Sequence, residues 1–257
     1  MLILVQFLLR LAFGLALAMV LTPSKQVTSG FYRNHAYVLL GLGTLAALVA
    51  FTRPELSPLW PPVAVAVASY VAAVCWLYEQ KQVGTASLAV VSALSLQAVW
   101  AGMARVVSSP LAESPAFRAD WILAALEPVS SGLLLGSTIG AMFLGHWYLN
   151  TPTMQLAPLR KLLVLLFAAV ALRAIVAEGL LLLNWHTLAD ANMLAYTLLA
   201  LQWLAGIVGV GITAWMSWQT LKIPNTQSAT GILYVAVIFT FLGELAGLLP
   251  LAAATTG

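Results

Sequence analysis

Five ionisable side chains lie inside long apolar stretches of this sequence, where a charged group is costly and usually marks a functional site. They are Arg10, Glu127, Arg173, Glu178 and Glu244. Two arginines against three glutamates leave one carboxyl group without a matching cation. A carboxyl group in apolar surroundings holds a proton more readily than one in water, which is the property of a proton carrier. A second interpretation is that the charges form salt bridges that only hold helices together.

The spacing of two of these residues limits how they can pair. Arg173 and Glu178 are five positions apart, and at about 100° per residue their side chains point about 140° from each other on a helix. They cannot easily pair within that helix. Each therefore needs a partner on another helix or access to water, because an unpaired charge in hydrocarbon is unfavourable.

The histidines suggest a haem site as an alternative chemistry. His35 begins one apolar stretch and His146 ends another, both near the same expected membrane surface, so they could bracket a b-type haem. His186 is expected alone on the opposite side. At about 100° per residue, His146 is rotated by about 80° from Gly136 and about 120° from Gly140, so it does not point across that glycine face. Hydrogen bonding at the interface is the preferred interpretation of His35 and His146.

Motifs of self-contained catalysis are missing from the sequence. There is no Gly-rich phosphate loop, no His-Glu-x-x-His, no Gly-x-Ser-x-Gly, no paired-acid motif of aspartyl intramembrane proteases and no Asp-rich prenyl-diphosphate motif. The single cysteine, Cys75, excludes an internal disulfide, a Cys-only zinc site and an all-Cys iron–sulfur cluster built by this chain alone. We expect no metal site, and any catalytic role is that of a subunit within an oxidoreductase.

The composition predicts an integral membrane protein. Charged residues make up 7% of the 257 residues, against about 25% in a soluble domain. Apolar residues make up 62%, and the mean hydropathy is +0.97. The net charge is +3, but no basic stretch is dense enough to bind nucleic acid. We expect the lipid bilayer as the surroundings and a cytoplasmic membrane of bacterial type as the location.

Eight apolar stretches have the length of about 20 residues that a membrane-spanning helix needs. We therefore predict an all-α bundle with short loops and one polytopic domain over residues 1–257. The stretches are 2–21, 36–52, 60–77, 84–106, 121–149, 160–184, 191–219 and 229–252. The third can begin at Pro61 and Pro62 only because proline is tolerated in the first turn of a helix.

The loop charges predict the orientation of the bundle. One set of alternate loops and helix ends contains Lys25, Arg33, Lys81, Arg160, Lys161 and Lys222, and the other contains Arg53, Arg105 and Arg118. The more basic side should be cytoplasmic, so both termini are predicted to be exterior. The acids agree, with Glu55, Glu113, Asp120 and Asp190 on the second side and Glu79 on the first.

Interfacial aromatic residues agree with this orientation, because tryptophan and tyrosine favour the headgroup level. The predicted outer ends carry Trp60, Trp121 and Trp185, and the inner ends carry Trp76, Tyr78, Trp147, Tyr148, Trp215 and Trp218.

The buried charges share one depth under this orientation. At a rise of about 1.5 Å per residue, all five lie about 9 to 16 Å below the outer surface. Gln97 and Gln202 come out at about 14 to 16 Å by the same arithmetic. The sequence thus predicts one polar layer in the outer half of the membrane, above an apolar inner half.

Glycines at four-residue spacing predict close helix packing. Gly132, Gly136 and Gly140 lie on one face of the fifth stretch, and Gly243 and Gly247 flank Glu244 in the last. Small residues let another backbone approach closely. The alternative for the first set is a flat wall for a planar cofactor.

A short motif hints at two repeated halves, 1–120 and 121–257. Thr22-Pro23 and Thr151-Pro152, each followed by a glutamine three residues after the proline, are 151 − 22 = 129 positions apart. Four helices in each half would give a parallel 4+4 repeat. Thr-Pro is also an ordinary connector between helices, and this is the preferred interpretation.

Two functions are consistent with these features. The first is a membrane anchor of a multi-subunit electron-transfer complex, whose polar layer binds a quinone and exchanges protons with it. The plan of eight short-looped helices is similar to that of anchor subunits of the dimethyl-sulfoxide-reductase type, without any shared residue motif. Redox or other membrane subunits would then be the partners.

The second function is a small-solute or proton-coupled transporter with its site between the two halves. Against it, the sequence lacks glycine and proline pairs in the middles of corresponding stretches. A structural or assembly subunit, whose buried charges only support the bundle, is a third alternative.

Overall fold

The computed structural model describes residues 2–52, 59–107, 117–151, 154–183, 185, 192–223 and 225–256, with the backbone alone for 104–107, 117–120 and 250–256. The described part is helical and contains eight helices long and apolar enough to cross a membrane, which indicates a multi-pass integral membrane protein. The helices are α1 (Leu2–Leu21), α2 (Ser29–Thr52), α3 (Trp60–Leu77), α4 (Lys81–Val107), α5 (Phe117–Asn150), α6 (Ala157–Leu183), α8 (Met193–Leu201), η1 (Gln202–Gly209), α9 (Val210–Thr220) and α10 (Thr226–Thr256).

The predicted apolar stretches correspond to these helices. The first and third were predicted with the observed bounds, and α3 begins with its two prolines in the first turn as expected. The prediction for α2 was wrong at its start, because the helix begins at Ser29 and not at residue 36. Its polar first turns are helical because Phe31 and Tyr32 are buried against the rest of the bundle.

The seventh membrane-spanning segment is one helix with an irregular middle. It runs from Met193 to Thr220 as α8, η1 and α9 without a break. Over η1 the backbone is a π-helix, a wider form that is rare and is often found at functional sites. The sequence showed no signal for it.

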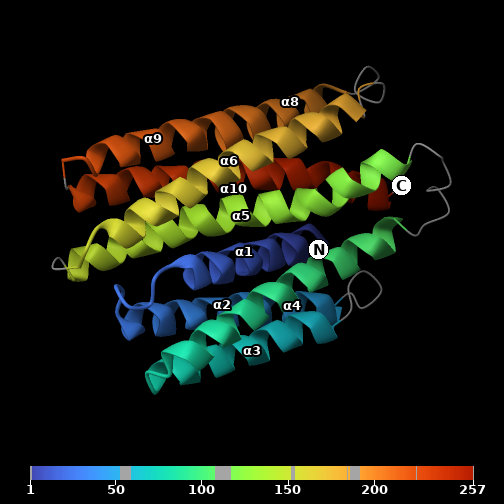
Figure 1. Cartoon of the computed structure of the whole chain (residues 1–257). Coiled ribbons are helices and arrows are strands. Elements are labelled where there is room, and N and C mark those ends of the chain that lie inside the picture. Colours follow the sequence, from blue (N-terminus) through green and yellow to red (C-terminus); the bar gives the residue numbers. More distant parts are fainter. Residues whose placement is uncertain are drawn as a thin grey trace.

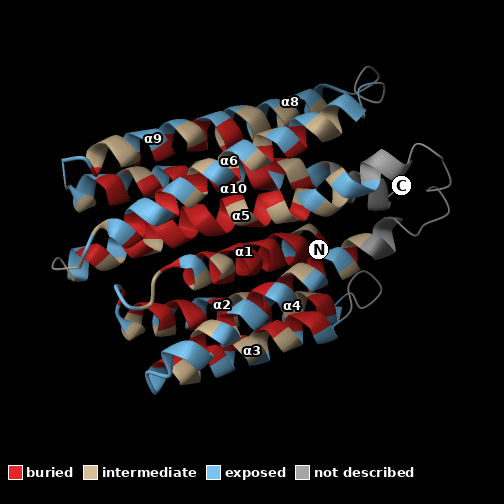
Figure 2. Ribbon diagram, in the orientation of Figure 1, coloured by how far each residue is buried: buried red, intermediate tan, exposed pale blue. Residues whose placement is uncertain are grey.

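Helix α1 lies at the centre of the bundle. Figure 1 shows α2, α3 and α4 on one side of α1, and α5, α6, α10 and the α8–α9 helix on the other. In α1, 78% of the apolar window is buried, against at most 56% in any other membrane-spanning helix, and Figure 2 shows this helix mostly as buried surface. The predicted halves 1–120 and 121–257 and their repeat stay predictions.

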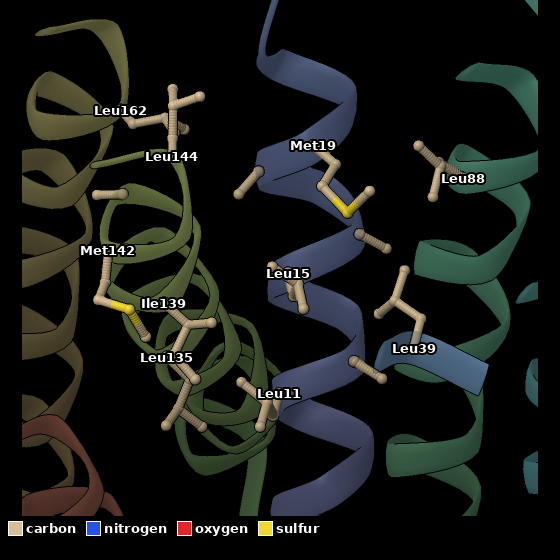
Figure 3. Packing of buried hydrophobic residues seen from close by; sticks show 14 of the residues in the cluster. Leu11, Leu15, Met19, Leu39, Leu88, Leu135, Ile139, Met142, Leu144 and Leu162 are labelled. Carbon is tan, nitrogen blue, oxygen red and sulfur yellow. The ribbon is translucent and has the colours of Figure 1, made fainter. Parts of the chain in front are cut away.

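The core between α1 and its neighbours consists mainly of leucines, alanines and valines, with a few methionines and aromatic residues. Figure 3 shows the packed side chains of Leu11, Leu15 and Met19 from α1, Leu39 from α2, Leu88 from α4 and Leu135, Ile139 and Met142 from α5. Each of these side chains is at most 8% exposed. Burial of this apolar surface inside the bundle fixes how the helices rotate about their axes, and thus which polar groups face inward.

One end of the bundle is rich in basic residues within the described part of the chain. The beginning of α1 and the end of α10 lie at one end, which we call the terminal face (Figure 1). The opposite end, the basic face, carries Lys25, Lys81, Arg160, Lys161 and Lys222 in loops or first helical turns. The predicted outer charges Arg53, Glu55, Glu113 and Asp190, as well as His186, Pro152 and Thr153, are outside the described residues, and the side chains of Arg105, Arg118 and Asp120 are not described.

The aromatic residues expected at the membrane surfaces divide into two kinds. Trp60, Trp121, Trp185, Tyr78 and Trp215 are exposed on the bundle, as a lipid-facing role requires. The interpretation was wrong for Trp76 and Tyr148, which are only 1% exposed. Trp76 stacks on Tyr32 with ring centroids 4.1 Å apart, because α2 and α3 bring the two rings together inside the bundle.

Candidate functional site: a buried charge cluster

Four of the five predicted intramembrane charges form one cluster near the centre of the bundle. It consists of Arg10 from α1, Glu127 from α5, Arg173 from α6 and Glu244 from α10, and we call it the charge cluster. The spacing of Arg173 and Glu178 predicts that Arg173 has no partner on its own helix. This prediction is confirmed, because the carboxylate partners of Arg173 lie on α5 and α10.

Glu244 is the fully buried acid of the charge cluster. Its two carboxylate oxygens accept hydrogen bonds from Nε and Nη2 of Arg173, at 2.8 and 2.9 Å. Ser131 from α5 donates a third hydrogen bond to Oε2 at 2.5 Å. The side chain is 1% exposed. A two-point arginine contact with an added hydroxyl donor offsets much of the cost of burying this carboxylate.

Glu127 bridges the two arginines. Its Oε1 accepts a hydrogen bond from Arg10 Nη1 at 2.6 Å and another from Arg173 Nη1 at 3.1 Å. The side chain is 17% exposed, whereas the other three members of the charge cluster are at most 2% exposed. Glu127 is therefore the member that a molecule outside the bundle can reach.

The helix that carries Glu127 lacks one backbone hydrogen-bond donor beside it. Pro128 is the next residue and lies within α5, and proline has no N–H to complete the helical hydrogen bond to the fourth residue before it. Ser130 lies one turn on and donates to the Glu127 carbonyl oxygen at 2.9 Å. Arg173 Nη1 also lies 3.4 Å from the Ser130 hydroxyl. The Ser130 hydroxyl therefore contacts both the α5 backbone and a guanidinium group of the charge cluster.

The charge cluster is neutral within the described residues, with two arginines and two glutamates. The surplus acid expected from the sequence is Glu178, which is exposed on the outside of α6 and forms no hydrogen bond with the cluster. Gln97 on α4 is exposed as well. Of the predicted polar layer, these two residues are not brought to the site, because the rotation of α4 and α6 turns them away from the interior.

Gln202 does lie beside the charge cluster. A Cβ atom built on Gly247 would be 3.0 Å from Gln202 Nε2 and 3.4 Å from Arg173 Nη2, so both polar groups approach the same point on α10. Gln202 is partly buried and is the first residue of the π-helix η1. The Gln202 amide adds a neutral hydrogen-bonding group beside the charged guanidinium group of Arg173.

Gln6 is a polar residue of the site that the sequence analysis missed. It lies one turn before Arg10 on α1 and is 1% exposed. Its Nε2 donates to the carbonyl oxygen of Val99 at 3.3 Å, while Gln6 Oε1 and Arg10 Nε have no partner among the described residues. A glutamine four residues before an intramembrane arginine, on the same helical face, was the signal that could have found it.

The glycine faces pack helices together, as predicted. A Cβ atom built on Gly14 would lie 1.6 Å from the carbonyl oxygen of Gly132, and one built on Gly136 would lie 1.8 Å from the carbonyl carbon of Gly14. Helix α1 therefore occupies the face considered for a planar cofactor. Gly140 continues this face, where its Cβ would lie 3.1 Å from the Cβ atom of Ala18.

A similar close approach joins α10 to the π-helix. A Cβ atom built on Gly243 would lie 2.2 Å from the Cα atom of Gly206. Gly247 lies one turn further along α10, against Gln202. These glycines bring Glu244, which lies between them in sequence, close to the helices that carry its partners.

The two histidines have different surroundings. His35 is 8% exposed, and its Nδ1 lies 2.6 Å from the carbonyl oxygen of Phe31. Its ring packs between those of Phe31 and Phe143, with centroids 4.3 and 4.4 Å away. His146 is exposed, and its Nδ1 lies 3.2 Å from the hydroxyl of Tyr234. His35 is therefore buried among aromatic rings with its Nδ1 at a backbone carbonyl, whereas His146 lies at the surface.

The described residues contain no group of three or more histidine, cysteine, aspartate or glutamate side chains placed to hold a metal ion. Comparisons of the chain with protein-family models, with curated proteins and with solved structures give no match. The chemistry of the site therefore has to be argued from the charge cluster itself. The two guanidinium groups favour the ionised form of the Glu127 carboxylate, and the adjacent Gln202 amide can donate a hydrogen bond to a carbonyl oxygen.

Proposed function

We propose that this chain is the membrane subunit of a multi-subunit electron-transfer complex, and that its charge cluster is the place where a quinone is bound and exchanges protons. The membrane would be a cytoplasmic membrane of bacterial type, with the terminal face outside. The observation that carries the proposal is the partial exposure of Glu127 within a network of buried charges. Ionisable groups at this depth are rare and mark proton or substrate paths by default.

The residues divide into two roles under this proposal. Glu127 transfers protons, because it is the accessible acid of the charge cluster, while Glu244 is enclosed by Arg173 and Ser131. The partly buried amide of Gln202 is the group that would donate a hydrogen bond to a quinone oxygen, whereas the Nε of Arg10, which has no partner among the described residues, is fully buried. Arg173 positions both carboxylates.

The quinone reaction needs a partner subunit that supplies or accepts the electrons. Reduction of a quinone to a quinol takes up two electrons and two protons, and the reverse reaction releases them. Glu127 would pass one proton at a time between the quinone oxygen and the water at the terminal face. The electrons would come from, or go to, a redox subunit, since this chain carries no Cys-only cluster site.

The first test is purification of the tagged protein from its native membrane in mild detergent. Mass spectrometry of the companions and a reduced-minus-oxidised optical spectrum of the same sample would be recorded. We expect stoichiometric iron–sulfur, cytochrome or other redox subunits. A colourless protein that purifies alone would contradict the anchor role and would favour a transport site in the charge cluster.

The second test compares two glutamates that differ in position. In the intact complex, Glu127→Gln should lower quinone turnover by about a hundredfold, the lower end of what a general acid or base contributes. Glu178→Gln removes the same charge from an exposed position on α6 and should leave turnover unchanged. Equal activity of both variants and the native complex would remove Glu127 from the mechanism.

A structural role is the second candidate, and the neutrality of the charge cluster favours it. Two arginines opposite two glutamates are sufficient to join α1, α5, α6 and α10 without any chemistry. In that case Glu127→Gln would lower the stability of the purified protein, and the turnover of each intact complex would stay at the native value.

A further inference from the structure

A cavity of about 590 Å³ lies at the basic face, beside the end of α1 and the start of α4. It shares no residue with the charge cluster, which lies deeper in the bundle around Arg10. Its lining residues are Val20, Ser24, Lys25, Lys81, Gln82, Thr85, Ala86 and Ala89.

The cavity lining includes charged and polar residues as well as apolar residues. Lys25 and Lys81 bring two ammonium groups from two separate segments, and neither forms an ion pair within the described residues. Ser24 adds a hydroxyl group to the lining, whereas the Thr85 hydroxyl donates to the Lys81 carbonyl oxygen at 2.8 Å. Two ammonium groups without an ion pair among the described residues, with a serine hydroxyl in the same cavity, are the chemistry that binds a phosphate group.

The remaining wall is apolar and follows the helices into the bundle. Val20 lies in the last turns of α1, while Ala86 and Ala89 lie on one side of α4 in its second and third turns. The small alanine side chains leave a groove beside Val20 that an acyl chain can fill. A free phosphate ion makes no use of this wall, whereas a phospholipid uses both ends of the cavity.

We propose that this cavity binds an anionic phospholipid, with its phosphate between Lys25 and Lys81 and one acyl chain along the alanine groove. The charge of the basic face supports this ligand, because the side rich in lysine and arginine is the side that faces the anionic leaflet of a cytoplasmic membrane. Basic pockets between membrane-spanning helices on that side bind anionic headgroups.

The test measures lipid binding to the whole purified protein by native mass spectrometry after delipidation in detergent. Phosphatidylglycerol is the probe, and phosphatidylcholine and inorganic phosphate are the comparisons. Lys25→Gln and Lys81→Gln should each weaken phosphatidylglycerol binding about fivefold, and the double variant about thirtyfold. Lys222→Gln removes the same charge from the same face outside the cavity and should change binding less than about twofold.

A third kind of variant separates a lipid from a free anion. Ala86 is exposed in the cavity wall, so Ala86→Leu fills the groove without removing a charge or disturbing the core. It should weaken phosphatidylglycerol binding about threefold or more while both lysines remain.

Three results would overturn the proposal. One is a loss of binding in Lys222→Gln as large as in Lys81→Gln, which would indicate general attraction to the basic face. Another is competition by inorganic phosphate at the same concentration as the lipid, with Ala86→Leu unchanged, which would indicate a site for the free ion. The third is native affinity in the double lysine variant.

Discussion

Replacement of Arg173 by methionine tests how the charge cluster is balanced. The guanidinium group donates two hydrogen bonds to Glu244 and one to Glu127. Without it, Glu127 keeps its contact with Arg10, at 2.6 Å, but Glu244 keeps only the hydroxyl of Ser131. Removal of one partner from a buried ion pair costs about 3 to 5 kcal/mol, because the other charge stays buried without compensation. We expect a loss of stability of this size.

The double variant Arg173→Met with Glu244→Gln gives the sharper result. It removes one positive and one negative charge, so Glu127 and Arg10 remain as a neutral pair. Because replacement of both partners of a buried pair is often close to neutral, the double variant should recover at least about half of the stability that the single variant lost.

The assay is unfolding of the purified protein in mixed micelles with increasing sodium dodecyl sulfate, followed by tryptophan fluorescence and circular dichroism. Arg160→Met is the control, because Arg160 donates one hydrogen bond to the Leu221 carbonyl oxygen at the basic face and its loss should cost about 1 kcal/mol. The single variant Glu244→Gln is measured as well. If the double variant loses as much stability as Arg173→Met and Glu244→Gln lose together, Arg173 and Glu244 do not act as a pair, and the reasoning is refuted.

Two further pairs of substitutions test the packing of the bundle by the same unfolding assay. Gly14→Ala should destabilise the protein by about 1 to 3 kcal/mol or more, because the new Cβ would meet the α5 backbone at 1.6 Å. Gly41→Ala places its Cβ where nothing lies within 4 Å, and should be neutral or slightly stabilising; an equal loss in both would refute the close approach of α1 and α5. His35→Ala should cost about 2 to 4 kcal/mol through lost packing with the aromatic rings around it. His146→Ala, from an exposed position, should cost less than about 1 kcal/mol, and the opposite ranking would contradict the described surroundings of the two histidines.

Most of the helical architecture could be predicted from sequence because the composition of a membrane-spanning helix is so restricted. Length and hydropathy located all eight membrane-spanning helices, and the bounds of α1 and α3 agree with the structure. The start of α2 was missed because hydropathy marks the apolar part of a helix and not its polar first turns. The π-helix was missed because its sequence, Gln202 to Gly209, has the composition of an ordinary helix.

The membership of the charge cluster was predictable only in part. An ionisable residue in an apolar run has to find a partner inside the bundle or turn outward, and the sequence cannot show which of the two occurs. Glu127 and Glu178 were predicted at a similar depth, yet one bridges two arginines and the other is exposed. The difference arises from how α5 and α6 rotate about their axes, which is decided by packing over their whole lengths.

The same limit explains the aromatic residues. Trp76 and Trp60 both lie at the ends of α3, and composition assigns both to the membrane surface. Only Trp60 is exposed, whereas Trp76 stacks on Tyr32 inside the bundle. Position along a helix was predicted correctly, but the direction in which a side chain points was not.

Two helices carry an unusual feature where they border the charge cluster: α5 contains a proline but stays α-helical through it, and the seventh membrane-spanning segment contains the π-helix η1. Pro128 follows Glu127 directly, and η1 begins at Gln202. An interhelical salt bridge by itself can form between regular helices, so it does not require either feature. Interruptions of helices inside a membrane are tolerated where side chains, water or a ligand satisfy the backbone groups that are freed. Because Gln202 of η1 approaches the same point on α10 as Arg173 Nη2, the π-helix supports our proposal that a polar group binds at the charge cluster.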